Sequence, residues 1–435
     1  LDFVRFSPSS EKVNFRFTTL LKNAPLTSTP DDDASLVEFY NSNMPQILSK
    51  WTVSDNNFSS SFLYNRNVGE IFDNSTKKFY VSLDNHKLPF YNILKTRLDH
   101  FVVGNFVASF GQGIIFESSD FFSPRKTGYG FSKRLSGINP DQTRSSQYTL
   151  KGIGFQISNP LLRLSLFGSK DKRDAIINCD DYDGDGICDE NSSFTSLIVM
   201  QPRVSWGLGQ NGDTTVFHKL TDSLEEITLG GNIRLSPLAG TNIGFTFYES
   251  LYNRVLNPQI TQTITGGPDL DYSGDTYYLT YLTNSADPEI NAMYSSQSES
   301  SLWKDAKSSR KVLGFDFSSV IKNLVVQGEY GILARDLSFK SLELSPKAAV
   351  LSTFFQFDNF NLLALYRNYD LEFDNPYQRS FSNYQRYKTS ILEDSYWLED
   401  PVYSFLYSAN PQPQSEEGIF LSSRYQFHRN ITGTL

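Results

Sequence analysis

The stretch at residues 151–168 reads KGIGFQISNPLLRLSLFG. In its first half, the apolar residues Ile153, Phe155 and Ile157 alternate with small or polar residues. A short turn, Ser158-Asn159-Pro160, leads into a second half, LRLSL, with the same alternation. A period of two is typical of a strand whose two faces meet different surroundings. The stretch therefore predicts a β-hairpin with one apolar and one polar face.

The same unit returns along the chain: an alternating segment, a short turn, a second alternating segment and a long polar connection. Short turns that alternate with long connections are typical of membrane-spanning β-barrels, with the turns in the periplasm and the loops outside the cell. In a compact soluble domain, structureless connections of such length are uncommon. We predict further hairpins at 227–247, 313–328, 351–369 and 419–435, and long connections at 170–191, 253–310 and 370–414.

The chain before residue 151 is less regular. Alternation returns at Val13–Phe17 and Phe79–Leu83, and Asp99–Phe116 is predicted as a strand pair or a bent strand interrupted by glycines. Asp33–Leu48 is the best candidate for a short helix, although a surface turn fits it equally well. The whole pattern predicts about twelve to fourteen strands, against the roughly 9 to 11 residues that one strand needs to cross a bilayer.

Composition supports this reading. Hydrophobic residues make up 39% and the mean hydropathy is -0.37, yet 14% of the residues are aromatic, led by 35 Phe and 24 Tyr. A barrel wall meets lipid on one side and water on the other and gathers aromatic rings at both interfaces. No stretch approaches the apolar length of a membrane-spanning helix, which excludes a helical membrane protein. The net charge of -9 argues against a nucleic-acid binder, because such proteins replace phosphate counterions with Lys and Arg.

We expect residues 1–435 to form a single all-β domain, a transmembrane antiparallel up-and-down β-barrel with short periplasmic turns and long extracellular loops. The chain begins as a processed chain would, without the basic and apolar regions of a signal peptide. The last hairpin stops in mid-strand at Leu435. Either the barrel is larger than this chain or its remainder is missing from the sequence.

An acidic segment within the expected extracellular loop 170–192 carries the sharpest local motif, CDDYDGDGICDE at Cys179–Glu190. Alternate Asp residues followed by Gly resemble the start of an EF-hand calcium loop and the calcium repeats of thrombospondin type. Two cysteines in one loop fit a local disulfide in an oxidising compartment. The alternative is a solvated acidic loop that is closed by a disulfide and binds no calcium. The expected ligands of a structural Ca²⁺ are Asp181, Asp183, Asp185, Ile187, Asp189 and Glu190, and the expected disulfide joins Cys179 and Cys188.

A basic cluster lies in the connection between residues 120 and 145, interleaved with aromatic residues. Inside a barrel, such a group lines a constriction and favours anions. The competing interpretation, which we rate higher, is a set of loop charges paired with nearby acids or with lipopolysaccharide phosphates. The members are Arg125, Lys126, Lys133, Arg134 and Arg144.

Other motifs give no sign of catalysis. The four histidines have no metal-ligand spacing, no Gly-x-Ser-x-Gly motif occurs, and the haem attachment motif Cys-x-x-Cys-His is missing from the sequence. Gly104, Gly111 and Gly113 resemble a phosphate loop, but no Lys-Ser/Thr pair follows them. We interpret these glycines as sites of strand bending or close packing, and we predict no enzyme.

Several short motifs resemble a family of outer-membrane barrels common in Bacteroidota and related phyla. Longer members of that family carry competence-type helix-hairpin-helix motifs before the barrel. This chain has no such segment, so the DNA binding associated with it does not carry over; the resemblance implies location and architecture. It covers roughly residues 57–175 and rests on Val103–Phe106, Phe110–Ile115, Ser132–Arg134, Gly137–Pro140, Lys151–Phe155 and Lys172–Ala175.

Two functions follow as hypotheses. The first is a porin-like conduit, or the membrane sleeve of a larger transport, secretion or uptake assembly in the bacterial outer membrane. The second is a structural or adhesive surface protein with calcium-stiffened loops. In both, the expected partners are outer-membrane lipid and lipopolysaccharide, together with other cell-envelope subunits in the sleeve variant.

Overall fold

The computed structural model has β-strands as its named elements. It describes residues 13–22, 45–67, 75–89, 95–119, 137–144, 149–177, 192–198, 206–210, 214–218, 221–256, 262–264, 306–334, 342–343, 345–370, 373, 375–378, 396–398 and 416–434. No helix in this part of the chain is long and apolar enough to cross a membrane.

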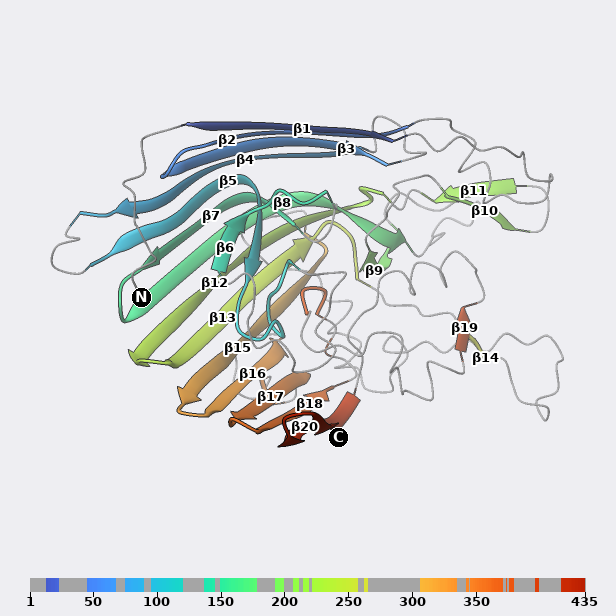
Figure 1. Ribbon diagram of the computed structural model, residues 1–435. Coiled ribbons are helices and arrows are strands. Elements are labelled where there is room, and N and C mark those ends of the chain that lie inside the picture. The colour runs from blue at the N-terminus through green and yellow to red at the C-terminus, as the bar shows by residue number, and fades with distance from the viewer. Residues whose placement is uncertain are drawn as a thin grey trace.

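One antiparallel sheet of seventeen strands dominates the structure (Figure 1). Each strand pairs with the next along the chain in up-and-down order, while β6 (Gly137–Pro140) and β9 (Phe194–Ile198) pair with the ends of β5 and β8. The remaining strands, in spatial order, are β1 (Asn14–Lys22), β2 (Gln46–Ser54), β3 (Phe58–Arg66), β4 (Thr76–Lys87), β5 (Arg97–Ser109), β7 (Leu150–Ser158), β8 (Leu162–Ile177), β12 (Leu224–Leu238), β13 (Thr241–Tyr252), β15 (Ser308–Ile321), β16 (Leu324–Ala334), β17 (Lys347–Gln356), β18 (Phe360–Tyr369), β20 (Glu416–His428) and β21 (Ile431–Thr434).

Two small antiparallel strand pairs lie outside this sheet. They are β10 (Trp206–Gln210) with β11 (Thr214–His218), and β14 (Gln262–Ile264) with β19 (Tyr396–Leu398).

All five predicted hairpins are confirmed. In the deciding stretch, Phe155 pairs with Leu166 and Gln156 with Ser165, so apolar residues oppose apolar ones and polar residues oppose polar ones. The predicted total of about twelve to fourteen strands is too low, in part because β2 and β3 lie where no alternating segment was predicted.

The two ends of the sheet differ as predicted. At one end, which we call the turn end, short turns join β2 to β3, β7 to β8, β12 to β13, β15 to β16, β17 to β18 and β20 to β21. At the other, the connection end, long connections follow β1, β5, β8, β13 and β18. This asymmetry is visible in Figure 1, where the turns lie to the left.

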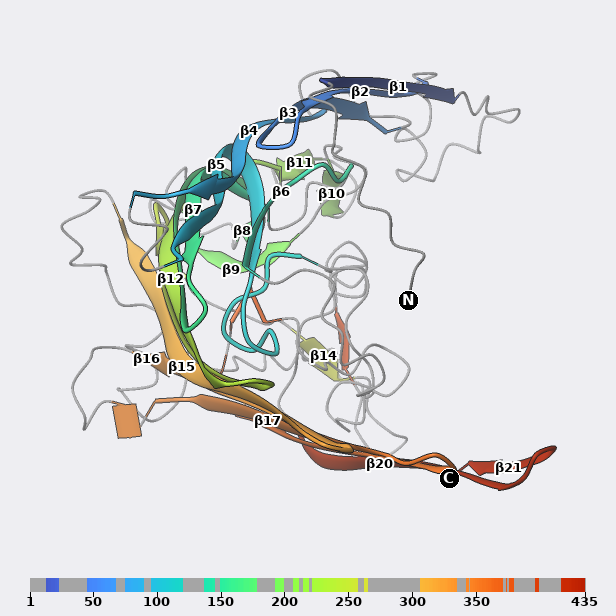
Figure 2. The same cartoon turned by 60° about the vertical axis from the view of Figure 1, so that its left-hand side comes forward.

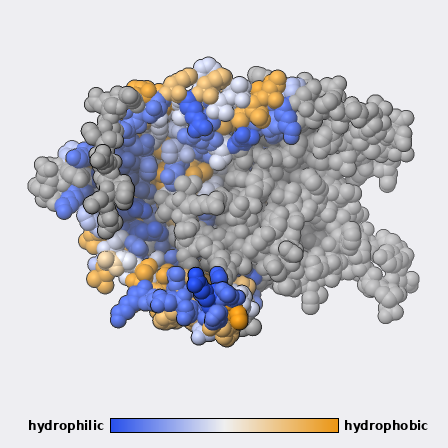
Figure 3. All heavy atoms as spheres, in the orientation of Figure 1, coloured by the Kyte–Doolittle hydropathy of each residue, from blue (hydrophilic) through white to orange (hydrophobic). Residues whose placement is uncertain are grey.

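The two faces of the sheet have the reverse of the usual polarity. On the convex face, Phe245 and Phe315 oppose each other on β13 and β15 and are 49% and 51% exposed. On the concave face of the same strands, Thr246 and Asp316 are buried. In Figure 3, hydrophilic residues gather in the hollow and hydrophobic residues lie along its rims. Water-soluble proteins bury apolar side chains and expose charged ones. The exposed apolar side chains of the convex face are therefore not typical of a surface in contact with water.

The sheet is strongly curved and open. Figure 2 shows it as a trough with β1 at one rim and β20 and β21 at the other. Among the described residues, β1 pairs only with β2, and β21 only with β20. The core lies inside the trough, between the concave face and segments that fold back from the connection end.

The structure differs from the sequence-based prediction at the boundaries of three segments. Gln46–Leu48, the end of the predicted helix Asp33–Leu48, belongs to β2, and the rest of that segment is outside the described residues. Lys170–Ile177, predicted as the start of the loop 170–192, continues β8. The predicted strand Asp99–Phe116 leaves the sheet after Ser109.

Candidate functional site

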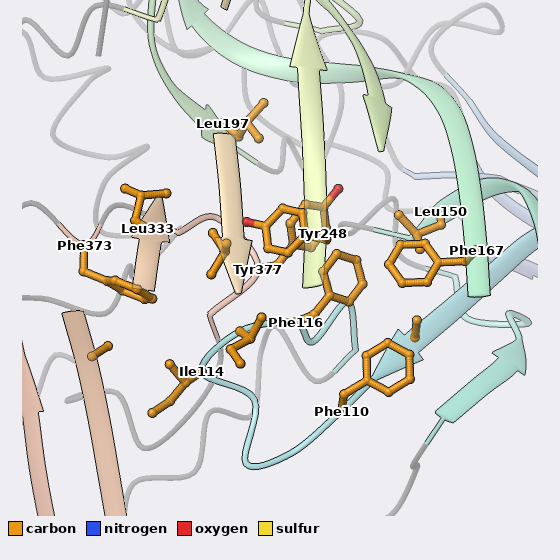
Figure 4. Packing of buried hydrophobic residues seen from close by; sticks show 14 of the residues in the cluster. Phe110, Ile114, Phe116, Leu150, Phe167, Leu197, Tyr248, Leu333, Phe373 and Tyr377 are labelled. Atoms are coloured by element: carbon orange, nitrogen blue, oxygen red, sulfur yellow. The ribbon is translucent and has the colours of Figure 1, made fainter. Parts of the chain in front are cut away.

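The site we consider is the interior of the trough, into which the chain folds directly after β5. Residues Phe110–Ser119, which we call the inward segment, are all buried. The segment turns on itself, with the amide of Phe110 donating to the carbonyl of Phe116 (3.0 Å), and returns to the sheet where Ser118 N donates to Ala108 O (2.9 Å). Figure 4 shows Phe110, Ile114 and Phe116 pointing among the core side chains of the surrounding strands.

A single carboxylate on the wall holds the tip of the inward segment. Glu329 on the concave face of β16 accepts hydrogen bonds from three backbone amides, those of Gln112, Ile114 (3.0 Å) and Ile115 (3.2 Å). Successive amides that converge on one anion form a nest. Gly111 and Gly113 have φ of 52° and 83°, which permit this curvature. The glycines that resemble a phosphate loop therefore do cradle an anionic group, and it is the protein's own.

Missing side chains on the wall make room for the tip. Gly314 on β15 pairs with Gly331 on β16, so two neighbouring positions of the concave face carry no Cβ. A Cβ on Gly314 would lie 2.8 Å from Ile115, and one on Gly331 would lie 3.2 Å from both Ile114 and Ile115. The glycine pair is therefore the depression that receives the two isoleucines.

A second stretch, residues 375–378 after β18, lies on the inward segment. Asn375 donates its side-chain amide to the carbonyls of Ile114 (2.7 Å) and Ile115 (2.8 Å) and accepts from the hydroxyl of Tyr248 on the wall. The amide of Glu117 donates to the carbonyl of Tyr377 (3.0 Å). The Tyr377 ring stacks on Phe116, with centroids 4.4 Å apart. Two connections from distant parts of the chain are thus bound together inside the trough.

A buried ion pair anchors the second stretch to the wall. Arg173 of β8 donates to Glu226 of β12 (2.8 Å) and to the carbonyl of Thr149 (2.7 Å), and the Tyr377 hydroxyl donates to the same carboxylate (2.8 Å). Tyr252 donates to the other Glu226 oxygen (3.2 Å). Burial raises the pKa of Tyr377 well above its ordinary value, so its hydroxyl stays protonated and can donate. Breaking such a network is costly because it strands a buried charge.

The turn-end half of the concave face is polar as well. Arg97 donates to Asp99 (2.8 Å) and Arg234 to Asp316 (3.0 Å). Asn232 on β12 donates to Thr246 on β13 (2.9 Å). The trough is thus apolar and filled near the connection end, and lined by charges and amides toward the turn end.

Of the predicted basic cluster, only Arg144 lies in the described part of the chain. Its side chain is exposed, and its carbonyl accepts a hydrogen bond from Asn65 of β3 (3.5 Å). The neighbouring Asp141 forms a buried ion pair with Lys78 of β4, which holds this connection against the wall. Outside the described residues lie Arg125, Lys126, Lys133 and Arg134.

The predicted calcium loop and disulfide also fall outside the described residues, so both stay predictions: Cys179, Asp181, Asp183, Asp185, Ile187, Cys188, Asp189 and Glu190. Elsewhere, in the part of the chain that the structure describes, no group of His, Cys, Asp and Glu side chains is arranged to hold a metal ion.

Sequence reasoning missed the wall residues Arg173, Glu226 and Glu329. A usable signal was present, because each lies at a concave-face position of an alternating strand, where a charge needs water or a partner. The identity of that partner was not readable, because it comes from a distant connection.

Neither a protein-family model nor a curated protein matches the sequence. Solved structures with similar folds include the copper transporter OprC, with 10% identity, a TM-score of 0.29 and coverage of 97% of this chain and 55% of that chain. Salmonella typhi OmpF in complex with daunomycin gives 11% identity, a TM-score of 0.26 and coverage of 85% and 94%. Pseudomonas aeruginosa OccK2 gives 8% identity, a TM-score of 0.24 and coverage of 82% and 79%. The chain spans about half the length of OprC.

Proposed function

We propose that this chain is a bacterial outer-membrane protein whose strands cross the bilayer and whose concave face lines a water-filled, porin-like passage. The observation that carries the proposal is the reversed polarity of the sheet, with exposed Phe and Leu outside and Asp, Glu, Arg and Asn inside. Every backbone polar group in hydrocarbon must be paired, so a membrane-spanning sheet has to close into a ring. We therefore expect the two open edges, β1 and β21, to be satisfied in the membrane.

The inward segment is the feature that sets the width of the passage. It occupies the trough at the level of Gly314, Gly331 and Glu329, and the second stretch backs it from the connection end. Toward the turn end, the wall carries the ion pairs Arg97–Asp99 and Arg234–Asp316, in which the Arg97 side chain is 55% exposed. A narrow region followed by a polar vestibule suits passage of small solutes better than a sealed anchor. We propose no catalytic residue.

The environment of the two ends follows from the same geometry. The convex apolar band would contact lipid, and the long connections would face outward among lipopolysaccharide headgroups. A role as the sleeve of a larger envelope assembly is compatible with the same barrel. That role requires a partner, which stoichiometric co-purification would reveal.

Single-channel recording tests the conduit. Purified full chain, folded in detergent and checked for heat-modifiable migration on gels, is added to planar lipid bilayers under a salt gradient. We expect stepwise conductance from the folded form and none from a boiled sample. A folded, membrane-inserted protein without conductance would overturn the passage while leaving the membrane location intact, whereas extraction from cells in plain buffer would overturn both.

A further inference from the structure

A row of directly opposed residues crosses the concave face near the turn end. Following the pairing from β5, Arg97 faces Ser158, Ser158 faces Arg163, and Arg163 faces Arg234. The row continues through Gly244 to Asp316. Three arginines and one aspartate therefore lie in one cross-strand row on the concave face.

The carboxylates near this row are already engaged. Asp99 accepts hydrogen bonds from Arg97 (2.8 Å), from the Ser158 hydroxyl (2.7 Å) and from the Gln156 amide (3.0 Å). Asp316 accepts from Arg234 through one oxygen (3.0 Å), while its other oxygen lies over Gly244, buried and without a hydrogen-bond partner among the described residues. On the adjoining strand β4, Asp84 is paired with His100 (2.8 Å). Glu329 is occupied by the inward segment.

Arg163 is the cation left over from these pairs. Its side chain makes no hydrogen bond or ion pair within the described residues, and the charges that act on it are those of Arg234, Asp99 and Arg97. Its direct cross-strand neighbour is another arginine. Like charges placed opposite each other destabilise a sheet, so nothing in the fold itself favours this arrangement.

A second observation at the same place points to a ligand. The Nε of Arg234 is buried and has no hydrogen-bond partner among the described residues. Buried donors are normally satisfied, and each exception calls for water or a ligand. An unpaired guanidinium and an unpaired guanidinium N–H thus lie on adjacent strands at one level.

We propose that Arg163 and Arg234 form a binding site for small oxyanions on the wall of the passage. The inference rests on the proposed function and names the substrate class of that passage. Guanidinium groups bind planar or tetrahedral oxyanions through paired charge-assisted N–H donors. A bound sulfate, phosphate or carboxylate would relieve the repulsion between the two arginines and satisfy the Nε of Arg234.

Equilibrium dialysis of radiolabelled sulfate against detergent-solubilised full chain tests the site without requiring an open pore. We compare the natural protein with Arg163→Gln and with Lys322→Gln, which removes the same charge from an exposed turn between β15 and β16. Sulfate affinity should fall about tenfold in Arg163→Gln, as expected for loss of one charge-assisted contact, and should not change in Lys322→Gln. Equal affinity in all three proteins, or no saturable binding to the natural protein, overturns the site.

Ion selectivity supplies the second readout. In planar bilayers under a KCl gradient, the reversal potential should shift toward cation preference in Arg163→Gln and stay unchanged in Lys322→Gln. If the protein binds sulfate through Arg163 but conducts no current, the anion site stands and the passage fails. Conductance that is equally anion-selective in all variants overturns the site and leaves the passage standing.

Discussion

The carboxylate of Glu329, on the concave face of β16, holds the inward segment inside the trough. A charge on a strand that crosses a bilayer is tolerated only where it faces water or a partner inside the protein. Glu329 faces a partner, the backbone of the inward segment, and its two oxygens accept three amide protons. An apolar residue at this position would leave those amides buried without acceptors.

The substitution Glu329→Gln tests this role with little change of shape. The glutamine keeps one acceptor oxygen and places an N–H₂ group against the remaining amides, so we expect a loss of about 1.5–3 kcal/mol from the hydrogen bonds to the charged group. The inward segment should then become cleavable by protease in detergent, and channel conductance should rise. Glu249→Gln is the matched control, because it removes a carboxylate from β13, two strands away from β16, where Glu249 pairs with Lys311 of β15. Unchanged protection from protease would refute the tether.

Within a strand, the alternation of apolar and polar residues determines which side chains lie on each face of the sheet. β15 places Leu313, Phe315 and Phe317 on the convex face and Gly314, Asp316 and Ser318 on the concave face. The alternation within each strand therefore indicates which of its two sides is apolar and would contact lipid. A shift of one residue in register would exchange the two sets, so the same pattern that indicates the environment also fixes the pairing.

Replacing Phe315 with Lys distinguishes lipid from water outside the sheet. If Phe315 faces hydrocarbon, Lys should cost about 2–4 kcal/mol near the middle of the bilayer, whereas an exposed surface position in water would change stability by only about 0.5 kcal/mol. Urea unfolding from lipid vesicles, followed by tryptophan fluorescence, measures the difference. Ser318→Lys, on the concave face of the same strand, should be tolerated. A near-neutral Phe315→Lys would contradict the membrane assignment.

The two ends of the sheet differ in the length of the segments that join its strands, and this difference predicts the orientation of the whole molecule. Every described short turn lies at the turn end and the long connections lie at the other. Outer-membrane barrels place turns in the periplasm and long loops outside, so this chain should have a fixed orientation.

Cysteine labelling on intact cells checks that orientation. With Cys179 and Cys188 replaced by Ser, a membrane-impermeant maleimide should label Lys307→Cys, an exposed position at the connection end. It should not label Asp358→Cys, an exposed position in the turn between β17 and β18, until the cells are broken. The opposite pattern would invert the topology, and labelling of both in intact cells would argue against a spanning barrel.

The sequence alone determined the five hairpins, their turns and the side that their residues face, because a period of two and a turn signal are local properties of the chain. It did not determine how the interior is filled. Phe110–Phe116 looked like a continuation of a strand, yet its amides bind a carboxylate 214 positions away from Ile115, and its carbonyls bind an asparagine 260 positions away. Those partners meet only after the sheet has curved, so only the tertiary structure decided which charges are paired within the protein and which, like that of Arg163, lie on the concave face without a partner among the described residues.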